Sequence, residues 1–201
     1  MSDVAKVVKV VEVVEVVEVV EVDAIITETT QWIERAVIGL NLCPFARAVH
    51  AKGQIRYAVC LADSPDALLI ALLDELQTLG STDAAVIDTT LLIHPNALTD
   101  FLDYNDFLGV ADAALVELDL AGVIQIASFH PQYQFADTEP DDISNFTNRS
   151  PYPTLHLLRE ASVTRAVAAF PEAADIFEKN IETMTRLGRA GWDKLHRTQE
   201  S

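Results

Sequence analysis

Three short stretches of the chain carry the pattern of hydrophobic and polar positions that is typical of strands. Apolar side chains recur at every second position from Ile55 to Leu61, as in a half-buried strand. The runs at 88–93 and 123–129 are short and strongly apolar, and each is bounded by residues that favour turns. The pattern therefore predicts three strands, each separated from the next by enough chain for a helix.

Helical patterns fill these gaps and flank the strands. Ser64 followed by Pro65 predicts the N-cap and first position of a helix that ends at Gly80. Because the connections between the strands are long and helical, we expect the strands to run parallel. The other helices are expected at residues 23–40, 97–118, 151–161, 162–169 and 171–187.

The alternation of strands and helices predicts one α/β domain over residues 23–188. We expect a small, mainly parallel sheet of three strands, or slightly more, with packed helices and a helical C-terminal part. The alternative is a ferredoxin-like α+β arrangement, which requires an antiparallel strand within the polar segment that follows residue 130. Residues 189–201 are expected to form a loose polar tail.

The first 22 residues form a low-complexity repeat of valine with lysine or glutamate. A charged side chain stands at every third position from Lys6 to Glu21. This period matches neither a helix nor a strand, so no core could bury one face of the segment. We expect the repeat to be mobile or a long frayed helix, without a chemical role.

Charge and composition restrict the partners. The chain has 201 residues and a formal net charge of −17, which repels nucleic acid and anionic membranes. No apolar run reaches the roughly 18 residues of a membrane-spanning helix. The two cysteines, Cys43 and Cys60, are expected to be reduced thiols in a cytoplasmic protein, with a disulfide as the alternative. A small molecule is the expected partner, and the oligomeric state is left open.

A polar loop of about twenty residues follows the third predicted strand. It has neither helical nor strand period, and such loops within a compact domain are usually functional or disordered. Disordered segments are poor in aromatic residues, whereas this loop contains Tyr133, Phe135 and Phe146. The loop therefore predicts a ligand site.

Two histidines stand at the ends of predicted strands. His94 and His130 would rise from the carboxyl edge of a parallel sheet, where α/β proteins bind ligands. His130 is the stronger candidate for a general acid or base because the polar loop starts from it. The alternative is that each ring closes its strand by bonding a neighbouring backbone group.

The predicted helix at 151–161 would place His156, Arg159 and Glu160 on one face. His156 with Glu160 could form an oriented general base, or an ordinary solvent-exposed pair. Arg149 and Arg159 are the candidate anion contacts, and we expect Arg149 to lie within reach of His130. The alternative is that Arg149 holds the loop in place by bonding Asp141 or Asp142.

Further candidates are polar or nucleophilic. Arg47, Asp141, Asn145 and Asn148 are candidate ligand contacts, although about half of the polar residues in the loop are expected to serve as turn scaffolding. Cys43 precedes Pro44 at a predicted helix N-terminus near Arg47, which would lower the pKa of its thiol and make it a nucleophile. The alternative is that Cys43 is a small buried apolar side chain.

His94, His130 and His156 lack metal-ligand spacing, so no metal is predicted, and the cofactor is unknown.

Several segments resemble a bacterial family known as domain of unknown function 1415. The matching segments are GLNLCPFAR, TTLLIHP with DFLDYNDFL, and IQIASFHPQYQF with TNRSPYPTLHLLRE. The resemblance extends over about residues 24–187 and excludes the N-terminal repeat. It implies no particular activity, but it supports the location of the site.

Two functions fit these residues. The first is an enzyme that acts on a small anionic metabolite, with His130 or His156 as general acid or base and arginines as anion contacts. The second is a non-catalytic small-ligand or regulatory binding protein that uses the same pocket. The sequence leaves open whether the protein is an enzyme.

Overall fold

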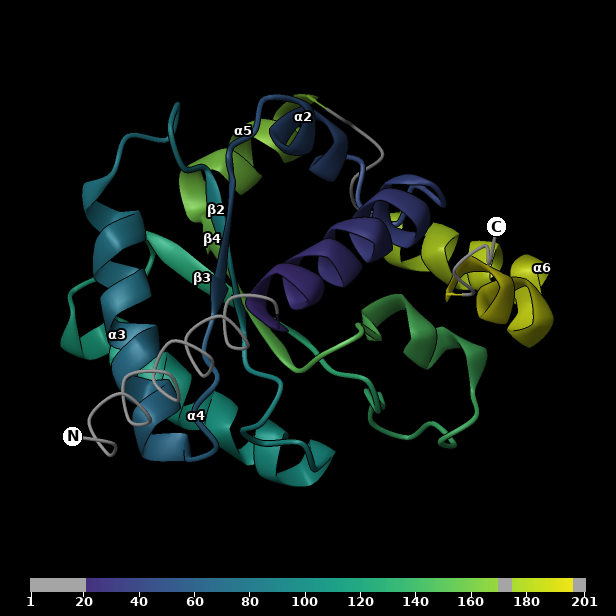
Figure 1. The fold of residues 1–201 in the computed structure, drawn as a ribbon. Coiled ribbons are helices and arrows are strands. Elements are labelled where there is room, and N and C mark those ends of the chain that lie inside the picture. Colours follow the sequence, from purple (N-terminus) through teal and green to yellow (C-terminus); the bar gives the residue numbers. More distant parts are fainter. Residues whose placement is uncertain (1–20, 170–174, 197–201) are drawn as a thin grey trace, which may run out of the picture.

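The computed structural model describes residues 21–169 and 175–196, and its centre is a four-stranded mixed sheet with helices on both faces (Figure 1). The order of the strands across the sheet is β1-β2-β4-β3. Their bounds are Ile55–Val59 for β1, Thr89–Ile93 for β2, Ile124–Phe129 for β3 and Thr154–Arg159 for β4.

The helices follow the predicted order before β3 and differ from it afterwards. Residues 21–32 form a helix that continues as a π-helix, η1, over Ile33–Ile38. Ser64 caps the next long helix by accepting a hydrogen bond from the Ala67 amide, as predicted. The remaining helices are α2 Ala46–Ala51, α3 Pro65–Ser81, α4 Phe101–Glu117, the 3-10 helix η2 Ile143–Asn148, α5 Glu160–Ala169 and α6 Ile176–His196.

The fourth strand overturns the prediction of a mainly parallel three-stranded sheet. β1 and β2 pair in parallel, whereas β4 is antiparallel to both of its neighbours, β2 and β3. The three predicted strands do share one sheet and one direction. β4, however, was predicted as a helix at 151–161, because Ser150 followed by Pro151 has the form of a helix start. The parallel β1–β2 pair also distinguishes the sheet from the ferredoxin-like alternative.

The first face of the sheet packs against α3 and α4, which lie together on one side in Figure 1. Every fourth residue of α3 from Leu68 to Leu76 is fully buried there. Leu92, Leu155 and Leu157 supply the strand side of this core. β2 is buried along its whole length, as expected of a central strand.

The second face packs against the N-terminal helix, η2 and α6, which lie on the opposite side in Figure 1. Trp32 and Ile33 of the N-terminal helix are buried over Leu91 and Ile93 of β2 in one hydrophobic cluster. The polar loop, residues 130–150, joins β3 to β4 beside this cluster. Its ends are therefore anchored in the two strands that it connects.

The C-terminal helix changes direction at Gly188. This residue has φ 63° and ψ 174°, a conformation that is essentially restricted to glycine. Beyond it the helix continues to His196, and Trp192 is buried against Phe146. The expected loose tail is therefore helical and packed over residues 189–196, whereas the N-terminal repeat lies outside the described residues up to position 20.

Candidate functional site

Asn145 holds the polar loop together from inside. Its side chain is completely buried, and its Oδ1 accepts hydrogen bonds from the Phe135 amide and the Thr138 hydroxyl, both at 2.9 Å. Its Nδ2 donates to the Glu139 carbonyl at 2.9 Å. The amide is thus used for loop scaffolding, which explains why a segment without regular structure keeps one shape.

The other polar candidates in the loop lie nearer its surface. Asn148 donates from Nδ2 to the Ser128 carbonyl at 3.2 Å and so fastens the end of the loop to β3. Asp142 caps η2 by accepting from the Ser144 amide at 2.9 Å. Asp141 is 97% exposed, and its carboxylate lies 3.9 Å from Nη1 of Arg189.

His130 is turned into the core and bonded on both ring nitrogens. The Gln132 amide donates to Nδ1 at 3.0 Å, so Nε2 carries the hydrogen and donates to the Leu98 carbonyl at 3.3 Å. Burial lowers the pKa of the ring below its ordinary value. His94 likewise uses Nδ1 to bind the Ala97 carbonyl at 2.9 Å. Both rings close their strands on backbone groups.

His156 lies on β4, not on a helix with Glu160. The Thr89 hydroxyl donates to the Leu157 carbonyl at 2.6 Å, so it must accept the hydrogen of His156 Nε2, which lies 2.8 Å away. This fixes the tautomer and leaves Nδ1 as the basic nitrogen. Burial lowers the pKa of His156 to about 4, so the ring is neutral at pH 7. Glu160 starts α5, and the predicted His156–Glu160 helix pair does not form.

Two candidate arginines hold helix ends. Arg159 donates to the carbonyls of Leu79 and Thr82, each at 2.6 Å, and to that of Ile87. It thereby binds the C-terminal end of α3, where a positive charge is favourable. Arg47 is exposed and donates to the Ile38 carbonyl of η1 at 3.4 Å.

Cys43 does not have the environment of an activated thiol. α2 begins at Ala46, two residues later than the predicted start at Pro44, so Cys43 is not its cap. Burial raises the pKa of the thiol, which contradicts the expected lowering. Both cysteines are free.

Arg149 lies across the polar loop. Its Nη2 donates to the Pro140 carbonyl at 2.7 Å and its Nε to the Tyr133 carbonyl at 3.3 Å. The guanidinium carbon is 4.0 Å from the centre of the Phe146 ring. Arg149 thus ties the loop together through backbone carbonyls, and not through aspartates. Two of its five N–H donors are used, which leaves three.

A second arginine converges on the same ring. The guanidinium of Arg189 lies 4.9 Å from the centre of the Phe146 ring, and its Nε binds Asp193 at 3.0 Å. Burial lowers the pKa of Arg149, and the charge of Arg189 acts in the same direction. The two arginines line a hollow of about 220 Å³, the arginine hollow, together with Pro131, Phe146, Ser150, Trp192 and Asp193.

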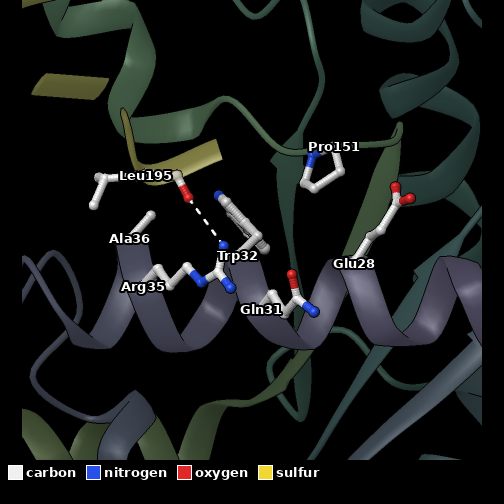
Figure 2. A pocket seen from close by; sticks show the side chains of 7 residues that line it. All are labelled: Glu28, Gln31, Trp32, Arg35, Ala36, Pro151 and Leu195. Atoms are coloured by element: carbon white, nitrogen blue, oxygen red, sulfur yellow. Dashed lines mark hydrogen bonds between the residues drawn. The ribbon is translucent and has the colours of Figure 1, made fainter. Parts of the chain in front are cut away.

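A second hollow, also of about 220 Å³, is lined by the N-terminal helix and by Pro151 (Figure 2). One face of the N-terminal helix forms its floor, and we call it the Trp32 hollow. Its lining residues are Glu28, Gln31, Trp32, Arg35, Ala36, Pro151 and Leu195.

Other kinds of site find no support in the part of the chain that the structure describes. Within residues 21–169 and 175–196, no three His, Cys, Asp or Glu side chains come together to hold a metal ion. Nor is any helix in these ranges long and apolar enough to cross a membrane.

Residues 24–194 match the family described as "Protein of unknown function (DUF1415)". The chain belongs to this family. No curated protein and no solved structure matches it. The matched range includes every residue of the arginine hollow and all but Leu195 of the Trp32 hollow.

The DUF1415 domain thus brings together a different set of residues from the one predicted. Arg149 is in a hollow, whereas His130, Arg159 and Asn145 are engaged within the fold. Sequence reasoning missed Arg189 because the segment after Gly188 was taken as a tail. Trp192, a large aromatic residue four positions beyond that glycine, was the signal for a packed helix.

Proposed function

We propose that this protein binds a small anion in the arginine hollow. The observation that carries the proposal is the convergence of Arg149 and Arg189 on the Phe146 ring. Two like charges repel each other, so an anion between them would relieve the repulsion as well as supply hydrogen-bond acceptors. Guanidinium groups suit carboxylate and phosphate because both ligands can accept two parallel N–H bonds.

The nearby acidic residues, Asp193 and Asp141, interact with Arg189 too weakly to exclude such a ligand. Asp193 occupies one N–H donor of Arg189, and Asp141 stands 3.9 Å from another. Exposed pairs of this kind contribute only about 0–1 kcal/mol. A ligand that accepts hydrogen bonds from both arginines can therefore compete with them.

The geometry favours binding over turnover. The residues that line the arginine hollow include no histidine, and His130, next to Pro131, has both nitrogens bonded to backbone. We propose a regulatory or storage role for the anion site in the cytoplasm, in keeping with the two free cysteines.

Inorganic phosphate is a direct probe of the site. The chain has two tryptophans, and Trp192 lines this hollow, so its indole N–H resonance should shift when phosphate is titrated at constant ionic strength. Arg189→Gln should weaken binding about tenfold or more, as expected for the loss of a charged hydrogen bond. Arg186→Gln, which removes an exposed charge from the same helix outside the hollow, should leave the affinity unchanged. Equal affinity of the wild type and Arg189→Gln would disprove the proposal.

A further inference from the structure

The Trp32 hollow has opposite charges at its two ends. Glu28, Gln31 and Arg35 lie on one face of the N-terminal helix, at spacings of three and four residues. Glu28 and Arg35 are seven residues apart, which places them two turns, or about 10 Å, apart along the helix axis. Figure 2 shows the side chains of Glu28 and Arg35 at the hollow, with that of Gln31 between them along the helix.

Part of the hydrogen-bonding capacity of these residues is already used. The Tyr152 hydroxyl donates to Oε2 of Glu28 at 2.6 Å, which fixes the carboxylate and leaves Oε1 available. Arg35 makes one long bond from Nη1 to the Leu195 carbonyl, at 3.5 Å. Both side chains are exposed, so a ligand can reach the remaining donors and acceptors.

The walls between the charges are apolar. The Trp32 ring lies between Arg35 and Pro151 in Figure 2, and Leu195 closes the far side. At about 220 Å³ the hollow is smaller than the roughly 300–1,000 Å³ of most small-molecule pockets. It therefore suits a short, narrow ligand.

We infer that the Trp32 hollow binds a short peptide of about three residues through its free ends. Glu28 receives the terminal ammonium group, Arg35 receives the terminal carboxylate, and the Gln31 amide pairs with a peptide group between them. Three extended residues span about 10 Å, which is comparable to the separation of Glu28 and Arg35 along the helix axis. A free amino acid carries both charges on one carbon and cannot reach both partners. This site is separate from the proposed anion site.

Triglycine is the probe, added to the full chain and followed through the two indole N–H resonances. Triglycine should shift the Trp32 resonance, whereas phosphate should shift that of Trp192. Assignment comes from a Trp32→Phe variant. Glycine at the same concentration should shift neither resonance. Because each hollow has its own reporter, failure of the peptide site is distinguishable from failure of the anion site.

Charge variants test the assignment of the two ends. Glu28→Gln keeps an acceptor for Tyr152 but removes the charge, and it should raise the Kd for triglycine about tenfold. Arg35→Gln should do the same. N-acetyl-triglycine should bind the wild type as weakly as triglycine binds Glu28→Gln, and Glu28→Gln should not distinguish the two peptides. Asp23→Asn, on the same helix but outside the hollow, is the matched control.

The proposal fails if the Trp32 resonance does not shift at a triglycine concentration of about 10 mM, because even a weak site with a Kd of about 1 mM would be occupied there. It also fails if Glu28→Gln and Asp23→Asn bind triglycine with the same affinity. Thermal denaturation of each variant shows whether it is folded. If Arg35→Gln is unstable, Arg35→Lys replaces it in the test; this variant keeps the charge and should retain most of the binding of triglycine.

Discussion

Arg159 shows how a single side chain can be mistaken for a ligand contact. We expect Arg159→Lys to lower the free energy of unfolding by about 1–3 kcal/mol, because an ammonium group cannot reach the three carbonyls that the guanidinium binds. Urea denaturation measures the change. Arg165→Lys, on the exposed side of α5, should change stability by less than about 0.5 kcal/mol. A stable Arg159→Lys variant that lost phosphate binding would instead support a ligand role.

His156 should make stability depend on pH. Its pKa is about 4 in the folded protein against 6.5 as the ordinary value, so the unfolded chain binds more protons between these two values. Stability is therefore lost as the pH falls through this window, and His156 accounts for about 2 kcal/mol between pH 8 and pH 5. His156→Gln, which can still donate to Thr89, should reduce the loss by that amount in urea titrations at the two pH values. An unchanged loss would show that the ring is solvated.

The residue-level predictions succeeded where local chemistry decides the outcome. Ser64 caps α3 as predicted, because the cap contacts only its own first turn. The partners of Arg159 lie 72 to 80 positions away in sequence, so no local pattern contains them. For Asn145 the sequence allowed scaffolding or ligand contact, and the burial that favours scaffolding is a property of the folded loop.

At the scale of elements, the bend in α6 determines where Arg189 and Trp192 lie. Gly188→Ala should cost about 1–3 kcal/mol, because alanine is strained at φ 63° and ψ 174°. If the helix straightens to avoid the strain, phosphate affinity should fall as well. Gly109→Ala is the matched control: it lies within α4 with open space at the position of an added Cβ, so it should be neutral or stabilise by up to about 1 kcal/mol. Thermal denaturation and phosphate titration together check both variants, and a neutral Gly188→Ala would mean that the bend is not constrained.

The element predictions failed mainly at β4. Ser150-Pro151 has the form of a helix start, but the Ser150 hydroxyl donates to the Tyr152 carbonyl and caps nothing. From Thr154 to Leu157 polar and apolar residues alternate, so that Leu155 and Leu157 enter the first core while Thr154 and His156 lie on the other face of the sheet. This alternation over four residues was the strand signal, and the Ser-Pro pair before it favoured the wrong assignment.

For the whole molecule, the N-terminal repeat should contribute little to stability. Its period allows no buried face, so deletion of residues 1–20 should change the Tm by no more than about 2 °C. Deletion of residues 1–38 should abolish cooperative unfolding, because it also removes Ile25, Trp32 and Ile33 from the second core. Differential scanning calorimetry distinguishes the two outcomes. A large drop in Tm for the shorter deletion would show that the repeat packs on the domain.

The position of β4 has a consequence for how the chain acquires its shape. The strand that is last in sequence lies inside the sheet, so β2 and β3 have no partner between them until residue 159 has been synthesised. Each of them presents an unpaired edge during that interval, and such edges are where nascent chains aggregate. Closing a loop of about twenty residues takes far less than a second, whereas translation at about 5–20 residues per second needs seconds to supply residues 130–159. Synthesis of this segment, and not closure of the polar loop, therefore sets the time for which the two edges of the nascent protein are exposed to aggregation.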